Sequence, residues 1–269
     1  MRSVASICVP DGDRALIDLH AHLLPGLDDG PADDAGSLAL AEHVAATGTR
    51  TIVATPHLRQ DFPDVRVPEL PGRVAALQAL LRDRGVDLEV LVGGEVDTVW
   101  AQHQSDETLR AVSYGGRGTD LLVETPYGEL PPVLEELLFR IRTRGFRVLL
   151  AHPERNPSFQ RDPERLGRIV DGGVLVQVTA SSLTAGKRSR SCALAHALIA
   201  EGRAHVIAGD LHSVGGRAGL AEALETTDHP RARWMVTDAP AAILAGEPLP
   251  PAPSAAAPKR RRWNLKRER

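Results

Sequence analysis

Residues 16–30 read Leu16-Ile17-Asp18-Leu19-His20-Ala21-His22-Leu23-Leu24-Pro25-Gly26-Leu27-Asp28-Asp29-Gly30, a short apolar run that ends in His-x-His and a polar turn. Side chains alternate between the two faces of a strand, so His20 and His22 point to the same side and can bind one metal ion. Asp29 adds an oxygen donor on a loop that can fold back after the Pro-Gly turn. The plain alternative is two solvated histidines at the end of a strand.

The same arrangement recurs along the chain, because other short apolar runs also end in histidine or carboxylate residues. The β-branched run 51–54 leads into Thr55-Pro56-His57, and the run 88–92 leads into Gly93-Gly94-Glu95, where two glycines allow close backbone approach. Later runs are followed by Glu124, His152, Asp210 and His212. The recurrence favours a shared site over unrelated polar ends.

Segments with helical spacing separate these runs. We expect helices at 37–46, 73–84, 132–144, 163–170, 192–200, 220–225 and 240–244. Strand and helix thus alternate about seven times, which is typical of a parallel α/β fold. A doubly wound sheet would string the polar strand ends along a crevice, whereas a closed barrel would bring them to one mouth. One shared site needs these polar strand ends close together, so the closed barrel is favoured.

The length and charge bound the organisation of the chain. Its 269 residues suffice for one large domain or two small ones, and we expect an N-terminal extension at 1–14, a barrel domain at 15–247 and a disordered Pro-rich and basic tail at 248–269. The net charge is -3, but residues 259–269 carry +6, which leaves -9 on the rest. With 3% aromatic residues, the body is not expected to bind nucleic acid.

The cysteines, the apolar runs and the basic tail bear on the cellular compartment and on contact with membranes. Cys8 and Cys192 are isolated, which fits a reduced, cytoplasmic setting, and no apolar run reaches the roughly 18 residues of a transmembrane span. The basic tail is expected to act as a solubilising end. The alternative is contact with anionic lipid headgroups through its basic residues and Trp263.

The strand-end residues form a set of candidate metal ligands without cysteine. They are His20, His22, Asp29, His57, Glu95, Glu124, His152, Asp210 and His212. Imidazole and carboxylate ligands suit Mn, Fe, Zn or Mg better than a structural zinc ion, which usually takes thiolates. The set exceeds the needs of one ion, and a carboxylate can bridge two. Two or three ions would stabilise the attacking and leaving oxygens of a displacement reaction, most naturally the hydrolysis of a phosphoester.

Two arginines follow the ligand motifs, and a planar guanidinium can bind phosphate through two hydrogen bonds. They are Arg155 and Arg217, and Arg217 taken alone is more typical of a surface ion pair. Other catalytic motifs fail. Gly186-Lys187 lacks the remaining residues of a nucleotide-binding P-loop, and the chain has no Gly-x-Ser-x-Gly elbow.

Taken together, these motifs resemble the polymerase-and-histidinol-phosphatase (PHP) superfamily. Within it, the chain is most similar to the manganese-dependent bacterial protein-tyrosine phosphatases of the CpsB/CapC/YwqE type, which are associated with capsule and exopolysaccharide synthesis. The resemblance extends from about Ile17 to Leu249 and includes the segments His20-Ala21-His22, Thr55-Pro56-His57, Ala151-His152-Pro153-Glu154-Arg155-Asn156 and Gly209-Asp210-Leu211-His212. It implies a distorted (β/α)7 TIM-like barrel, the PHP fold, with a trinuclear centre at the C-terminal ends of its strands.

The resemblance also implies roles for individual residues. One ion would be held by His20, His22, Glu95 and Asp210; Glu95 would bridge to a second ion on His57 and His152; Asp29, Glu124 and His212 would hold the third. Mn²⁺ is the implied metal, with Fe, Zn or Mg as alternatives. The candidate catalytic residues are Arg155, Arg217 and Asp210. The arginines would bind phosphate while a metal-bound hydroxide attacks phosphorus, without a phosphoenzyme.

Three functions therefore remain open at this point. The first is a phosphotyrosine-protein phosphatase, whose implied partner is the tail of a tyrosine autokinase that regulates polysaccharide export, with oligomers possible. The second is a small-molecule phosphomonoesterase of the histidinol-phosphatase kind, which uses nearly the same ligands. The third is a non-catalytic regulatory module with a metal site, since a barrel does not guarantee chemistry.

Overall fold

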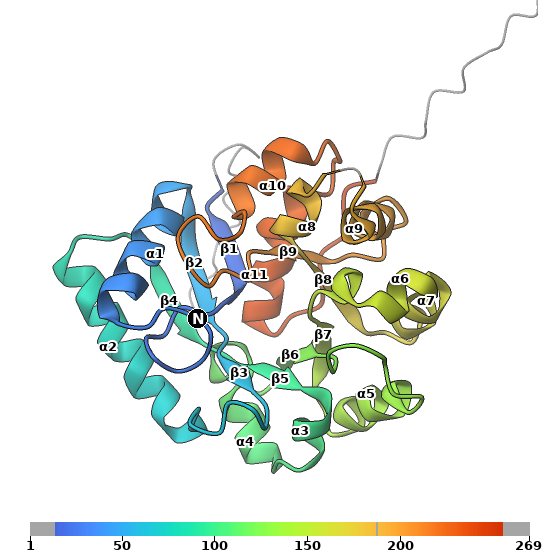
Figure 1. Cartoon of the computed structure of the whole chain (residues 1–269), viewed down its shortest axis with the longest axis horizontal. Coiled ribbons are helices and arrows are strands. Elements are labelled where there is room, and N and C mark those ends of the chain that lie inside the picture. The colour runs from blue at the N-terminus through green and yellow to red at the C-terminus, as the bar shows by residue number, and fades with distance from the viewer. Residues whose placement is uncertain (1–13, 187, 255–269) are drawn as a thin grey trace, which may run out of the picture.

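The computed structural model describes residues 14–186 and 188–254 (Figure 1). Its strands are short and evenly spaced along the chain. They are β1 (Leu16–Ala21), β2 (Thr49–Ala54), β3 (His57–Leu58), β4 (Glu89–Val92), β5 (Glu95–Asp97), β6 (Asp120–Glu124), β7 (Arg147–Leu150), β8 (Leu175–Thr179) and β9 (Val206–Ala208). Every paired strand runs parallel to its neighbour.

The helices follow the strands, as the sequence predicts, although several boundaries differ by a few residues. They are α1 (Asp34–Ala46), α2 (Leu70–Asp83), α3 (Thr98–Gln102), α4 (Asp106–Ala111), α5 (Leu134–Thr143), α6 (Pro157–Arg161), α7 (Pro163–Asp171), α8 (Ala180–Thr184), α9 (Arg190–Ala200), α10 (Leu220–Thr226) and α11 (Asp238–Ala245). The start of α1 lies before the predicted one because the Asp33 carboxylate accepts a hydrogen bond from the Gly36 amide and caps the helix.

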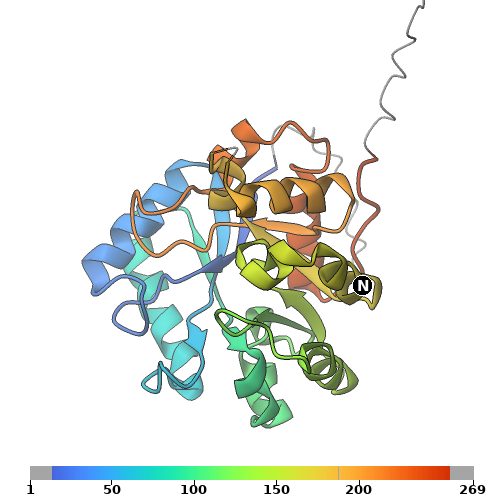
Figure 2. The same cartoon turned by 45° about the vertical axis from the view of Figure 1, so that its right-hand side comes forward.

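The strands form a curled parallel sheet with helices around its outside, as the two views in Figures 1 and 2 show. Hydrogen bonding gives the order β1-β2-β4 in one part and β3-β5-β6-β7-β8-β9 in the other. The sequence prediction of an α/β fold with a TIM-like parallel sheet is therefore confirmed at this level.

Two local features separate β2 from β3 and β4 from β5. Pro56 has no amide hydrogen and interrupts the ladder, although its carbonyl still accepts a hydrogen bond from the Glu95 amide at 3.0 Å. Gly93 and Gly94 let the two chains approach, because a Cβ on either would lie 2.6 Å or less from a side chain of the neighbouring strand segments. The breaks turn His57 and Glu95 towards the carboxyl ends of the other strands.

The two outer strands of this order, β1 and β9, also meet. The His22 amide donates to the Leu211 carbonyl and the Asp210 amide to the His20 carbonyl, both at 2.8 Å, and Ala21 forms an isolated parallel bridge with Leu211. The carboxyl ends of the first and the last strand are therefore neighbours in space.

Alternating strand residues supply two hydrophobic layers. In β6, Leu122 belongs to a small cluster built mainly from strand residues, whereas Leu121 and Val123 belong to the larger cluster between the strands and the helices. This two-sided burial is typical of strands in a parallel sheet, and it explains their continuous apolar runs.

The end of the described chain differs from the prediction. Leu249 and Ala252, which the sequence places in a disordered tail, pack against the hydrophobic core, because partial burial of their apolar side chains is favourable. Residues 1–13 of the predicted extension at 1–14, and the basic segment 259–269, lie outside the described residues. Within the described ranges, no helix has the length and apolar character needed to span a bilayer.

Candidate metal centre

All nine candidate ligands lie together at the carboxyl ends of the strands. His20 lies within β1 and His22 just after it, His57, Glu95 and Glu124 lie in β3, β5 and β6, His152 follows β7, and Asp210 and His212 follow β9. Asp29 reaches the group from the loop after β1, as the sequence predicts. Its side chain is half exposed, whereas the side chains of His20, His22, Glu95 and Asp210 are buried.

Glu95 lies at the middle of the group. Its Oε2 atom is 3.0 Å from His57 Nδ1 and 3.3 Å from Nε2 of both His20 and His22. Its Oε1 atom accepts a hydrogen bond from His152 Nε2 at 2.8 Å. One buried carboxylate therefore faces four imidazoles from three other strands.

Four of these inward-facing atoms have no hydrogen-bond partner among the described residues. They are His20 Nε2, His22 Nε2, His57 Nδ1 and Glu95 Oε2. Buried polar atoms are nearly always paired, because an unpaired one costs free energy comparable to a lost hydrogen bond. Donor atoms that converge without pairing are what a cation site requires, so these residues fit a bound metal ion.

The outer nitrogens of two histidines fix which nitrogen faces inward. His20 Nδ1 donates to Gln177 Oε1 at 3.1 Å, and His22 Nδ1 donates to Asp28 Oδ2 at 2.6 Å. With the proton on Nδ1, the lone pair of Nε2 points to the centre of the group. Partners of this kind orient metal-binding histidines and raise their basicity.

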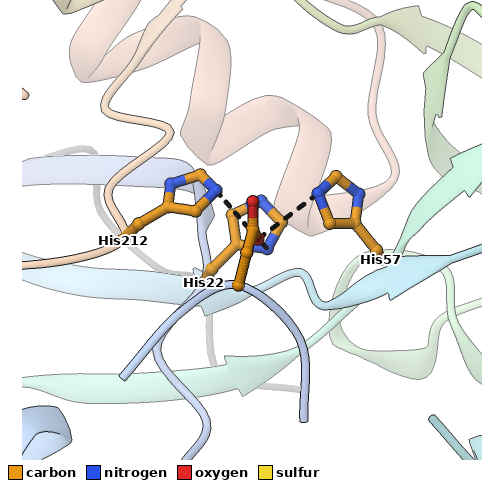
Figure 3. Close-up of side chains that lie close together, drawn as sticks. His22, His57 and His212 are labelled. Carbon is orange, nitrogen blue, oxygen red and sulfur yellow. Dashed lines mark ion pairs between the residues drawn. The ribbon is translucent and has the colours of Figure 1, made fainter. Parts of the chain in front are cut away.

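A second group surrounds Asp29. Its Oδ1 atom lies 3.1 Å from His212 Nε2, 3.5 Å from His57 Nε2 and 3.8 Å from His22 Nδ1. Figure 3 shows the rings of His22, His57 and His212 around this point, and the rings of His22 and His212 stack with centroids 4.1 Å apart. His57 presents one nitrogen to each group and so joins the two.

The division among ions implied by the resemblance needs one revision. Glu124 lies with His57 and Glu95, and its Oε1 atom is 3.9 Å from His152 Nε2, whereas Asp29 and His212 group with His22 and His57. The reason is the register of β6, which pairs Leu122 with Glu95 and Glu124 with Asp97. Glu124 therefore belongs to the group around Glu95.

The buried carboxylates and imidazoles of the group shift each other's pKa values. Burial alone opposes the charged form of Glu95, but the neighbouring His20 lowers the pKa of this carboxyl well below its usual range. Burial likewise opposes protonation of His152, but the hydrogen bond to Glu95 raises its pKa to about 9. The positive charge of the protonated His152 ring therefore balances the Glu95 carboxylate, and a bound cation would take over this role as the ring loses its proton.

Both candidate arginines lie at the edge of the ligand group and donate hydrogen bonds to Asp210. Arg155 Nη1 donates to Asp210 Oδ2 at 2.5 Å, and Arg217 Nη1 donates to the same oxygen and to the Asp210 carbonyl. Asp210 Oδ1 faces His20 Nε2 and His22 Nε2 at 3.4 and 3.5 Å. A guanidinium has five N–H donors, so each arginine keeps donors for an anion.

Two residues of the site have left-handed backbone. His152 has φ of 32° and Asp210 has φ of 50°, a region that non-glycine residues rarely adopt. The turn after His152 is held by Glu154, which is fully buried and whose Oε1 atom accepts three hydrogen bonds, two from Thr179 and one from Ser182. This anchor fixes the backbone that carries His152 and Arg155.

Three further residues lie at the site, although they are not among those predicted from the sequence. Asp28 and Gln177 hold the outer nitrogens of histidines, and Arg59 donates to Glu124 Oε2 at 3.1 Å. The Asp-Asp pair in residues 28–29 was a usable signal for Asp28. Gln177 and Arg59 are ordinary polar residues in the sequence, and only the fold brings them to the ligands.

A curled parallel sheet that carries clustered histidines and carboxylates at its carboxyl ends is the arrangement of a TIM-like, metal-dependent enzyme. Comparison with known proteins defines the family. The family model described as "Capsular polysaccharide synthesis, CpsB/CapC" matches residues 16–237, and the chain belongs to this family.

Two named relatives agree with this assignment. Tyrosine-protein phosphatase YwqE of Bacillus subtilis is 30% identical over 201 residues, which cover 74% of this chain and 78% of the relative. The putative tyrosine-protein phosphatase CapC of Staphylococcus aureus is 28% identical over 204 residues, which cover 75% and 79%.

Solved structures agree on the fold. A chain from the crystal structures of YwqE from Bacillus subtilis and CpsB from Streptococcus pneumoniae, described as unique metal-dependent tyrosine phosphatases, matches with a TM-score of 0.77 and 26% identity. The match covers 90% of this chain and 100% of that chain. A β-aspartyl dipeptidase of Fervidobacterium islandicum matches with a TM-score of 0.54 and 14% identity, and this likeness concerns the fold alone.

Proposed function

We propose that this chain is a metal-dependent phosphotyrosine-protein phosphatase, a phosphoric monoester hydrolase. The observation that carries the proposal is the set of buried, unpaired donor atoms of His20, His22, His57 and Glu95, which converge beside two arginines. Membership of the CpsB/CapC family, whose named relatives are tyrosine-protein phosphatases, supports the reaction class.

The site is proposed to lie at the mouth of a distorted (β/α)7 barrel of the PHP type. The contacts between β1 and β9 and the near-continuous paths from β2 to β3 and from β4 to β5 support seven strand positions around one axis. Such a barrel places its chemistry at the carboxyl ends of the strands.

The ligand set is proposed to hold three cations, of which Mn²⁺ is the first candidate and Fe, Zn and Mg the alternatives. One group is His20, His22, Glu95 and Asp210, a second is Glu95, Glu124, His57 and His152, and the third is Asp29 and His212. When bound, such cations supply an activated water and neutralise charge on phosphoryl oxygens.

The residues of the chain bind and orient the phosphate. Arg155 and Arg217 would use their remaining donors to hold its non-bridging oxygens, since guanidinium groups bind phosphate through paired hydrogen bonds. Asp210 accepts from both arginines and so fixes them relative to His20 and His22. Asp210 is therefore proposed to align the phosphate as well as to hold a cation.

The physiological setting is also part of the proposal. A protein phosphotyrosine, in particular the tail of a tyrosine autokinase, would be the substrate in the cytoplasm, and the chain is proposed to form an oligomer. The basic segment 259–269, outside the described residues, is proposed to contact anionic lipids. Vesicle co-sedimentation of the full chain and of a chain ending at residue 258 tests this contact, and equal binding by both contradicts it.

Side-by-side turnover of a phosphotyrosine peptide and of histidinol phosphate tests the main proposal. The protein is first stripped with a chelator and then assayed with and without added Mn²⁺. Metal-dependent hydrolysis of the peptide supports the proposal, and selective hydrolysis of histidinol phosphate favours a small-molecule phosphatase. Turnover of neither leaves the regulatory module.

A further inference from the structure

A small cavity opens beside the candidate metal centre. It has a volume of about 120 Å³, and its lining includes Glu124, Tyr127, His152, Arg155 and Asn156. Two of these residues are candidate metal ligands, and Arg155 is a candidate phosphate-binding residue. The cavity is therefore the side of the site from which the rest of a phosphoester would extend.

One wall of this cavity is an exposed aromatic residue in the loop between β6 and α5. Tyr127 is 64% exposed, a large fraction for a side chain of its size. The guanidinium carbon of Arg59 lies 4.2 Å from the centre of its ring and covers one face. The high exposure of Tyr127 leaves much of its side chain uncovered by the protein.

Arg59 links this aromatic wall to the metal centre. Its Nη1 atom donates to Glu124 Oε2 at 3.1 Å and its Nε atom to Asp61 at 2.6 Å, and its side chain is only 14% exposed. A guanidinium held by two carboxylates and stacked on an aromatic ring is a stable support, because cation–π contact and charge-assisted hydrogen bonds act together. The ring of Tyr127 thus has a fixed place relative to Glu124.

The cavity has the dimensions and chemistry for an aromatic group. A protein cavity of about 150 Å³ is large enough for benzene, and this cavity is of similar size and open on one side. Arg155, with 39% of its side chain exposed, supplies donors for an anion on the same cavity. An aromatic wall and an anion-binding group on one small cavity match the two ends of an aryl phosphate.

We propose that Tyr127, supported from behind by Arg59, is a specificity-determining residue whose exposed side chain stacks on the aromatic ring of an aryl phosphate held by Arg155. The inference rests on the proposed phosphatase function and adds to it the group that separates aryl from alkyl phosphoesters. A phosphorylated serine side chain would leave this wall without a partner.

Binding of two uncleaved analogues to the full, Mn²⁺-loaded chain tests the inference. We expect the wild type to bind phenylphosphonate about three- to tenfold more tightly than methylphosphonate, the range that one aromatic pair provides. Y127A should bring this ratio close to one, whereas Y127F should keep it. The matched control is F139A, because Phe139 is also a highly exposed aromatic residue but lies on α5 away from this cavity.

Loss of the preference in Y127A, with the preference retained in Y127F and F139A, supports the inference. No preference in the wild type, a preference kept in Y127A, or equal loss in F139A overturns it. Hydrolysis of a phosphotyrosine peptide by the wild type is measured separately. Absence of turnover with an intact binding preference refutes the phosphatase function and leaves the aryl-binding site standing.

Discussion

Replacement of Asp28 by asparagine removes a carboxylate charge that acts on the metal site only through His22 and His57. Asp28 Oδ2 accepts from His22 Nδ1 at 2.6 Å and from the His57 amide at 3.0 Å, and Oδ1 accepts from the Gly30 amide at 3.1 Å. The side chain is 1% exposed, so solvent does not screen these contacts. An asparagine has the same shape but only one accepting atom.

The size of the effect follows from those contacts. If the amide oxygen faces His22, the amide nitrogen meets the Gly30 N–H, and if the amide is flipped, its nitrogen meets the donors of His22 and His57. A hydrogen bond to a charged group contributes about 1.5–3 kcal/mol and a neutral one about 0.5–1.5 kcal/mol. Mutation of such outer partners weakens metal affinity about ten- to hundredfold, which converts to about 1.4–2.8 kcal/mol and is the size of one hydrogen bond to a charged group.

The assay is competition for Mn²⁺ between the protein and a fluorescent chelator, followed by kcat/KM on a phosphotyrosine peptide. D33N is the matched control, since Asp33 caps α1 away from the site and asparagine caps helices equally well. We expect D28N to lose affinity and D33N to match the wild type. Equal affinity of D28N and wild type, within twofold, would refute the role of Asp28 in orienting His22.

Further predictions concern other groups. R155M and R217M should each raise KM for a phosphotyrosine peptide about ten- to hundredfold through lost charge-assisted hydrogen bonds, while R140M, which removes an exposed helix ion pair, should leave KM unchanged in the same steady-state assay. E154Q should lower the free energy of unfolding in urea by about 1–3 kcal/mol, because Glu154 Oε1 accepts three buried hydrogen bonds; an unchanged unfolding midpoint would contradict this. Burial lowers the pKa of His205 to about 4. As the pH falls, this histidine therefore binds a proton in the unfolded chain before it does so in the folded one. The contribution of His205 to stability should be constant above pH 6.5 and fall by up to about 3 kcal/mol between pH 6.5 and 4, and H205Q should flatten this part of the slope in urea titrations across that range.

The sequence was sufficient for the position of the site along the chain. Each candidate ligand except Asp29 lies at or just after the end of a short apolar run, and in a parallel sheet all such ends lie on one edge, so local patterns were enough to place His57, Glu95 and Asp210 on the same side. The turn after β1 also predicted the return of Asp29. These inferences need only strand periodicity and turn chemistry.

The sequence was not sufficient for the details that depend on register. The grouping of Glu124 with Glu95 follows from how β5 pairs with β6, and a shift of one residue would turn Glu124 to the other face. The run 234–236, which shows only apolar character in the sequence, forms a 3-10 helix packed in the core. The partners Gln177 and Arg59 come from distant segments whose contacts only the assembled sheet defines.

Anomalous diffraction from crystals of the full chain grown with Mn²⁺, with data collected on both sides of the manganese edge, examines the site itself. We predict difference peaks between Glu95 and the nitrogens of His20, His22 and His57, with a further peak beside Asp29 and His212. An ordered site with these side chains in the same positions and no anomalous peak among them would contradict the proposal that they hold metal ions.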